Sequence, residues 1–66
     1  SVCAICGKGP ENNLRWRNRL NIDHDHKTGK IRGLLCERCN LFIGQSGDNI
    51  TLLQLAAEYL IKYGVE

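Results

Sequence analysis

Hydrophobic and polar residues alternate along residues 20–26, which is the period of a β-strand. One face of this strand would carry aliphatic and imidazole side chains, and the other would carry an amide and two carboxylates. The first set is Leu20, Ile22, His24 and His26, and the second is Asn21, Asp23 and Asp25. A polar turn at residues 27–30 contains Gly29, and residues 31–36 then return as a second strand with Gly33 inside it. The pattern predicts a β-hairpin.

Two helices are predicted after the hairpin. The first covers residues 37–43 and ends at Gly44. The second begins after Asn49 or Thr51, either of which can cap it, and runs to about Tyr63 before another glycine. Its apolar stripe consists of Leu52, Leu55, Ala56, Tyr59, Leu60 and Tyr63. In so short a chain we interpret this stripe as core that covers the hairpin.

Four cysteines form two pairs with the same C-x-x-C spacing, and they are Cys3, Cys6, Cys36 and Cys39. At 66 residues the chain is expected to be one small domain, residues 1–66, which hydrophobic burial alone stabilises poorly. The spacing is typical of a zinc site, since both sulfurs of a pair can face one ion. Disulfide pairing is one alternative. Another is a zinc site with two cysteines and two histidines, which would leave the second cysteine pair unused.

Positive charge is concentrated near the histidines and around Trp16, although the net charge is small. The formal net charge is +2, and four thiolates with one Zn²⁺ would bring it to about 0. The two basic groups are Arg15, Arg17 and Arg19, and Lys27, Lys30, Arg32 and Arg38. The first group also alternates, so residues 14–19 could form a short strand, with Trp16 either packed or stacked on a base. This distribution favours a polyanionic partner.

The sequence contains no recognisable signal peptide and no apolar run near the roughly 20 residues that a membrane span needs. An intracellular, cytoplasmic location without a membrane partner is therefore expected.

The predicted hairpin would bring the end of its first strand, Asp-His-Asp-His, beside the start of the first helix, near Asn40. A strand carboxylate and a helix amide could hold Mg²⁺, which needs few protein ligands and borrows oxygens from a phosphate. A neutral imidazole could accept a proton from an attacking water molecule. Such a set of residues is sufficient for metal-assisted hydrolysis of a phosphodiester.

The stretch L-N-I-D-H-D-H-K-T-G-K-I-R-G-L-L-C-E-R-C-N, with C-A-I-C upstream, resembles the recombination endonuclease VII family. This family belongs to the HNH, or ββα-metal (His-Me finger), nucleases and is typically encoded by phages. The resemblance extends from Cys3 through the C-terminal helix. It implies an α+β fold, namely a small zinc-stapled ββα-metal domain with an additional C-terminal helix.

The resemblance also implies roles for individual residues. Asp23 and Asn40 would hold the catalytic Mg²⁺ or Mn²⁺, His24 would be the general base, and His26 would lie near the scissile phosphate. Structural zinc would be bound by Cys3, Cys6, Cys36 and Cys39. Phosphate contacts, inferred from charge alone, would come from Arg15, Arg17, Arg19, Lys30 and Arg32. Because strict alternation sends Asp23 and His24 to opposite faces, a bulge or strong twist at the strand end is also expected.

The sequence thus predicts a metal-dependent DNA endonuclease that nicks one strand. The resemblance implies that it acts in a phage-infected host cell. The resemblance also implies that members which resolve branched DNA carry further helices that build a dimer, and the elements predicted for residues 1–66 are not expected to supply them. Two alternatives remain open. The chain could be a zinc-bound nucleic-acid-binding module without catalysis. It could instead be the catalytic fragment of a larger junction-resolving or sequence-specific nuclease, with specificity supplied by a partner protein or a missing segment.

Overall fold

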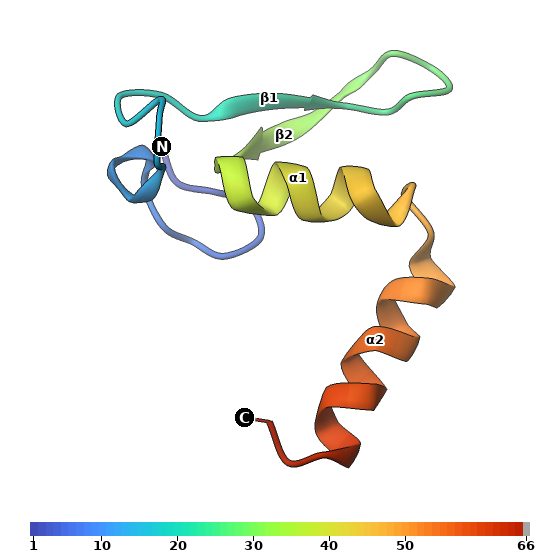
Figure 1. Cartoon of the computed structure of the whole chain (residues 1–66). Coiled ribbons are helices and arrows are strands. Elements are labelled where there is room, and N and C mark those ends of the chain that lie inside the picture. The colour runs from blue at the N-terminus through green and yellow to red at the C-terminus, as the bar shows by residue number, and fades with distance from the viewer. Residues whose placement is uncertain (66) are drawn as a thin grey trace.

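A β-hairpin is followed by two helices in the computed structural model, which describes residues 1–65. A short 3₁₀ turn, η1 (Pro10–Asn12), precedes the strands β1 (Asn21–His24) and β2 (Ile31–Leu35). The helices are α1 (Glu37–Ser46) and α2 (Ile50–Lys62). Helix α1 lies along the hairpin and contacts both strands, whereas α2 turns away from them (Figure 1). The predicted α+β class is confirmed.

The two strands pair in antiparallel fashion, as predicted, but β1 is shorter than the predicted strand over residues 20–26. Asp25 leaves the strand because its Oδ1 accepts hydrogen bonds from the backbone N–H groups of Lys27, at 2.8 Å, and Thr28, at 3.1 Å. Gly29, with φ of 77°, closes the same turn by donating to the Asp25 carbonyl. Asp25 therefore organises the turn that positions both strands.

An irregularity in the strand pairing lies between Asp23 and His24, as predicted. Asp23 is opposite Gly33, but His24 is opposite Ile31, so Arg32 is the extra residue of a β-bulge. The extra residue lies on β2 and not on β1. A bulge increases the local twist at this point, but half-buried and exposed positions still alternate along β1, with Asp23 half-buried and His24 exposed.

The predicted end of the first helix at Gly44 is wrong. Helix α1 continues through Gly44 to Ser46, and Gly47 is the residue that ends it. Gly47 has φ of 66° and donates its N–H to the carbonyls of Gly44 and Ile43. A glycine within a helix costs about 1 kcal/mol relative to alanine, which is small enough for the helix to continue.

Helix α2 has the predicted extent, and Asn49 caps it, because the Asn49 Oδ1 accepts the Leu52 N–H at 2.9 Å. Its end is closed by Gly64, with φ of 72°, and by a hydrogen bond from the Val65 N–H to the Leu60 carbonyl. No helix of the described residues is long and apolar enough to cross a membrane.

The prediction that the α2 stripe is core is wrong. Leu55 is 55% exposed and Tyr59 is 64% exposed, and the Tyr59 ring packs on that of Tyr63, with 5.1 Å between ring centroids. The chain turns at two consecutive residues with positive φ, Gly47 and Asp48, and α2 then leads away from the hairpin (Figure 1). An amphipathic pattern identifies an apolar face but does not specify what covers it.

The core is centred on the cysteines. The buried apolar residues are Cys3, Leu35, Cys36 and Cys39, with Leu20 and Ile43 packed against them. So few buried aliphatic side chains provide little hydrophobic stabilisation, and therefore the cysteine cluster is central to the fold.

Candidate metal centre and hairpin site

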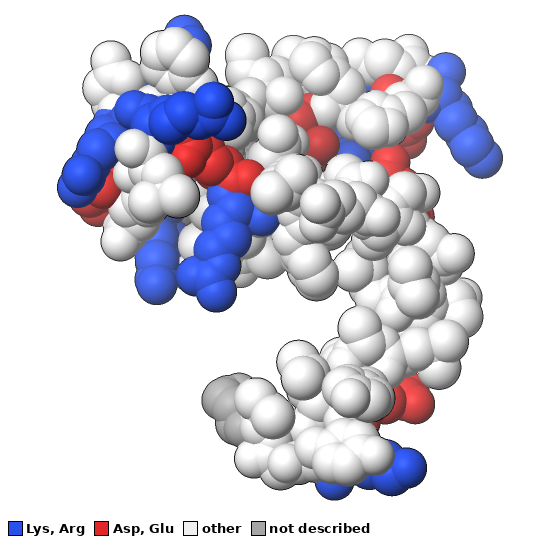
Figure 2. Space-filling model, in the orientation of Figure 1, with Lys and Arg blue, Asp and Glu red and all other residues white. Residues whose placement is uncertain are grey.

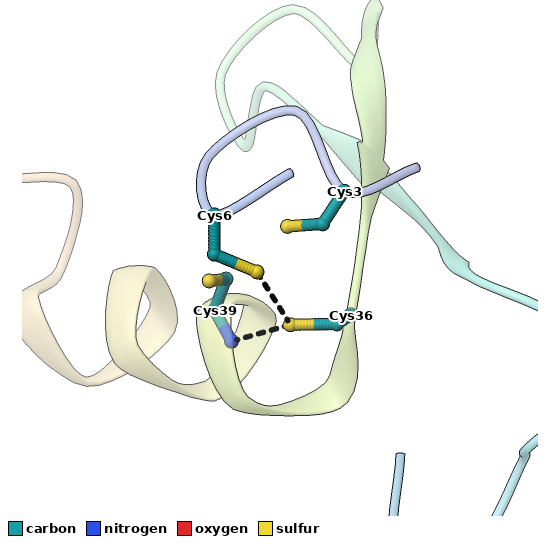
Figure 3. A group of neighbouring side chains, drawn as sticks. All are labelled: Cys3, Cys6, Cys36 and Cys39. Carbon is teal, nitrogen blue, oxygen red and sulfur yellow. Dashed lines mark hydrogen bonds between the residues drawn. The ribbon is translucent and has the colours of Figure 1, made fainter. Parts of the chain in front are cut away.

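The four cysteine sulfurs converge between the N-terminal loop and the start of α1 (Figure 3). All four Sγ atoms lie within 4.8 Å of one another, and the Cys6 and Cys36 sulfurs are 3.8 Å apart. Four sulfurs bound at 2.3 Å to a tetrahedral zinc would be about 3.8 Å apart. The cysteines are not joined by disulfide bonds, so the cluster is positioned like a zinc site.

Backbone N–H groups support the cluster, as zinc-bound thiolates require. The Ile5 N–H donates to the Cys3 sulfur at 3.4 Å, and the Cys39 N–H donates to the Cys36 sulfur at 3.5 Å. Each of these bonds closes one C-x-x-C turn. Among the described residues, one group of three or more cysteine, histidine or acidic side chains has converging ligand atoms, and it consists of the four cysteines. The alternative zinc site with two cysteines and two histidines is therefore not formed.

The cluster cannot easily carry four negative charges without a cation. Burial raises the pKa of the Cys39 thiol to about 12, and contacts with the neighbouring thiols act in the same direction. Burial also acts to raise the pKa of Cys3, but hydrogen bonds from backbone N–H groups, led by that of Cys36, outweigh it and lower the pKa to about 6. One thiolate is therefore favoured and a second is opposed, and a bound Zn²⁺ would remove this opposition.

Asp23 lies on the half-buried side of β1, and its carboxylate is held by Arg32. The Arg32 Nε donates to Asp23 Oδ2 at 2.7 Å, and Nη2 donates to Oδ1 at 3.0 Å. The same Nη2 also donates to Asp48 Oδ1 at 3.2 Å. Hydrogen bonding to Arg32 lowers the pKa of Asp23 below its ordinary value, and the charges of His26 and His24 act in the same direction. Asp23 is thus an ionised carboxylate surrounded by basic groups.

The other residues predicted for this site lie on neighbouring elements. His24 ends β1 and is exposed, and His26 is exposed in the following turn. Asn40 is exposed in the first turn of α1, and its N–H donates to the Cys36 carbonyl. The structure joins Asp23, Arg32 and Asp48 by direct contacts. The metal-binding and catalytic roles of Asp23, His24, His26 and Asn40 remain predictions.

The loop at residues 14–19 does not form the short strand that the alternating arginines suggested. Instead it is fixed to α1 by Glu37, whose carboxylate accepts the N–H groups of Leu14, Arg15 and Trp16 at 2.8 to 3.3 Å. Bonds to these groups, led by that of Trp16, lower the pKa of Glu37. The Arg19 guanidinium stacks over the Trp16 ring at 4.7 Å.

Asn13 holds the same loop from inside, and sequence reasoning missed both Asn13 and Glu37. Asn13 is only 4% exposed, and its side chain bonds to the carbonyls of Trp16 and Arg19 and to the Glu37 N–H. The result is a basic surface over the N-terminal loops and the start of α1, where lysine and arginine side chains gather (Figure 2). We call the segment of residues 14–19 the basic loop.

Comparison with known proteins identifies the chain's relatives. The recombination endonuclease VII family matches residues 1–62. The chain belongs to this family. A protein named Gene 59 protein from Mycobacterium phage D29 is 49% identical over 61 residues, covering 91% of this chain and 34% of the relative. The protein of the same name from Mycobacterium phage L5 is 43% identical over 61 residues, covering 91% of this chain and 35% of the relative.

No solved structure matches the chain. The chain spans about a third of the length of the curated relatives that it matches.

Proposed function

We propose that this chain is a metal-dependent DNA endonuclease that hydrolyses backbone phosphodiesters and nicks one strand at a time. The observation that carries the proposal is the match of the recombination endonuclease VII family over residues 1–62. This match includes the hairpin with its bulge, the cysteine cluster and the start of α1.

In this proposal, Zn²⁺ on Cys3, Cys6, Cys36 and Cys39 is structural. The sulfur spacing and the N–H groups directed at the sulfurs fit a closed tetrahedral site, in which all four positions are taken by protein ligands. A closed site has no position for substrate. The ion instead joins the N-terminal loop to α1, which carries Asn40 and Glu37.

A second divalent ion, Mg²⁺ or Mn²⁺, would be held by Asp23 and Asn40. Asp23 fits this role because hydrogen bonding to Arg32 keeps its carboxylate ionised, which is the form that binds a cation. Carboxylate and amide oxygens are ligands that hard cations prefer. When bound, the ion would neutralise negative charge on the phosphoryl group and stabilise the departing oxygen.

His24 would serve as the general base, accepting a proton from the water molecule whose oxygen attacks phosphorus. It is exposed at the end of β1, so both water and a DNA phosphate can reach it. The base must be neutral to accept the proton. His26, in the adjoining turn, would help to position the scissile phosphate.

DNA would be contacted through its phosphates by the basic loop and by residues of the hairpin. The proposed contacts are Arg15, Arg17, Arg19, Lys30 and Arg32. Glu37 and Asn13 support this role because they fix the loop backbone, which leaves the arginine side chains exposed. Phosphate contacts position a protein on DNA without reading its sequence. Weak sequence preference is therefore expected.

The curated relatives are longer than this chain, and this difference bears on which DNA the chain would prefer. Because this chain spans about a third of them, other segments or a partner protein would supply any preference for branched or specific DNA. The isolated chain should then nick DNA indiscriminately.

The test is conversion of supercoiled plasmid to relaxed circles with Mg²⁺ or Mn²⁺. The unmodified chain is compared with His24→Ala and with Lys62→Ala, a control at the far end of α2, all at equal zinc content. Nicking by the unmodified chain and the control, lost in His24→Ala, supports the proposal. If no protein nicks, or all nick alike, the proposal fails and a DNA-binding module without catalysis becomes the better description.

A further inference from the structure

Arg32 occupies an unusual position for a residue beside a candidate cation site. Its guanidinium covers both oxygens of Asp23, the carboxylate that would hold the ion. Positively charged side chains repel a divalent cation, so a permanent contact of this kind would oppose the proposed function. An ion can therefore bind to the Asp23 carboxylate only if Arg32 moves off its oxygens.

The β-bulge explains how Arg32 reaches Asp23. Asp23 is paired with Gly33 and His24 with Ile31, so Arg32 is the residue that has no partner in the register. In a regular hairpin Arg32 would be paired with His24. The extra residue instead allows the guanidinium to form two parallel bonds with the carboxylate, an arrangement that favours arginine over lysine.

Asp48 provides a second partner for the same guanidinium. It follows the Gly47 that ends α1, has φ of 60° although it is not glycine, and accepts from Arg32 Nη2 at 3.2 Å. The Arg32 side chain is 35% exposed and that of Asp48 is 27% exposed, compared with 12% for Asp23. Arg32 therefore has a second acidic partner, Asp48, that it can keep when it leaves Asp23.

We propose that Arg32 takes the place of the divalent cation on Asp23 and moves onto Asp48 when the cation binds, so that the Arg32–Asp48 pair sets the affinity of the site. This inference rests on the proposed function. Two carboxylates and one guanidinium leave one excess negative charge, which a divalent ion converts to one excess positive charge. A DNA phosphodiester, with its single negative charge, would balance it.

The affinity for Mn²⁺, measured by electron paramagnetic resonance of the free ion in the absence of DNA, tests this exchange. All proteins carry one equivalent of zinc. Arg32→Gln should lower the Kd for Mn²⁺ about fivefold, because a well-formed surface ion pair contributes up to about that factor. Lys62→Gln, which loses the same charge far away, should leave the Kd unchanged. Asp23→Asn should raise it at least about tenfold.

Arg32→Lys tests whether the paired hydrogen bonds from Arg32 to Asp23 affect the Kd for Mn²⁺ beyond the effect of the positive charge. It keeps the positive charge but cannot form the paired bonds, so it should also lower the Kd for Mn²⁺, although less than Arg32→Gln does. An Arg32→Gln variant that binds Mn²⁺ no more tightly than the unmodified chain would overturn the proposal. Equal binding by Asp23→Asn would do the same.

A double-mutant cycle tests the role of Asp48. If Asp48 acts by receiving Arg32, Asp48→Asn should raise the Kd several-fold in the unmodified chain and have little effect in the Arg32→Gln background. An equal effect in both backgrounds would mean that Asp48 acts through its own charge, and would overturn the transfer.

The resonance of the Arg32 Nε–H group provides a readout in which Arg32 itself is unchanged. It should shift on titration with Mg²⁺ and stay fixed in Asp23→Asn, and an unchanged resonance in a chain that binds the ion would contradict the exchange. These binding results are independent of cutting. If the Kd responds as expected and no DNA is nicked, the proposed function fails alone; if DNA is nicked through His24 and the Kd does not respond, this inference fails alone.

Discussion

Replacing Asn13 with alanine should destabilise the domain more than its position in a loop suggests. The Asn13 side chain donates to the Trp16 carbonyl at 2.7 Å and to the Arg19 carbonyl at 3.0 Å, and it accepts the Glu37 N–H at 3.0 Å. It is also 4% exposed. The substitution removes all three bonds and leaves the first N–H of α1 without its partner.

The expected loss in the free energy of unfolding is about 2 kcal/mol. Each intramolecular hydrogen bond contributes about 1 kcal/mol net, and water can replace part of the interaction at the two carbonyls, because Trp16 and Arg19 are exposed. A domain of this length has a total stability of about 3 to 10 kcal/mol. The substitution therefore removes a large share of it.

Urea denaturation of the zinc-loaded protein, at a fixed zinc concentration, measures this loss. Asn12→Ala is the matched control, because Asn12 is the adjacent asparagine and its side chain is exposed. A loss below about 0.5 kcal/mol for Asn13→Ala, or an equal loss for both variants, would refute the reasoning.

Three further predictions concern the metals and Asp23. Removal of zinc by a chelator should abolish the cooperative melting transition and much of the far-UV circular dichroism, because the core is built on the cysteines; full retention of both would contradict this. Asn40→Ala should raise the Mg²⁺ concentration for half-maximal nicking at least about fivefold and change the stability by less than about 0.5 kcal/mol, whereas an unchanged Mg²⁺ dependence would exclude Asn40 as a ligand. Because the pKa of Asp23 is lowered from 3.8, the Asp23–Arg32 contact contributes stability above that pH and loses it only as the pH falls through the lowered value. The Asp23 carboxyl ¹³C resonance should accordingly move less between pH 7 and about 4.5 in the unmodified chain than in Arg32→Gln, and equal movement would argue against the pairing.

Local patterns predicted the parts of the fold that depend on local chemistry. Alternation in residues 20–26 placed β1 from spacing within a few residues. The two C-x-x-C pairs predicted the cluster because each pair has the local spacing of a zinc half-site, and one ion takes four thiolates although Cys6 and Cys36 are 30 positions apart. The bulge was also predicted, from the need to bring Asp23 and His24 to one phosphate. Only the structure shows that its extra residue is Arg32.

Features that depend on contacts between distant residues could not be predicted in this way. The bond between the Asn13 side chain and the Glu37 N–H joins positions 24 apart in sequence, and the Asp23–Arg32–Asp48 contacts need both the bulge and the turn after α1. The error at Gly44 has a similar cause, since two glycines three residues apart can each end a helix and only the backbone path decides between them.

The exposed face of α2 illustrates a different limit. Its apolar spacing correctly predicted a helix with one apolar side, but not the consecutive positive φ angles at Gly47 and Asp48 that direct α2 away from the hairpin. Burial of that face was inferred from the shortness of the chain, and this inference was wrong.

The most direct test of the central claim is plasmid nicking by His24→Gly with and without added imidazole, beside the unmodified chain. The account predicts that the unmodified chain nicks DNA with Mg²⁺, that His24→Gly is slower by at least about a hundredfold, and that imidazole restores part of the rate. Equal rates for the two proteins without imidazole, or no nicking by either, would contradict the account.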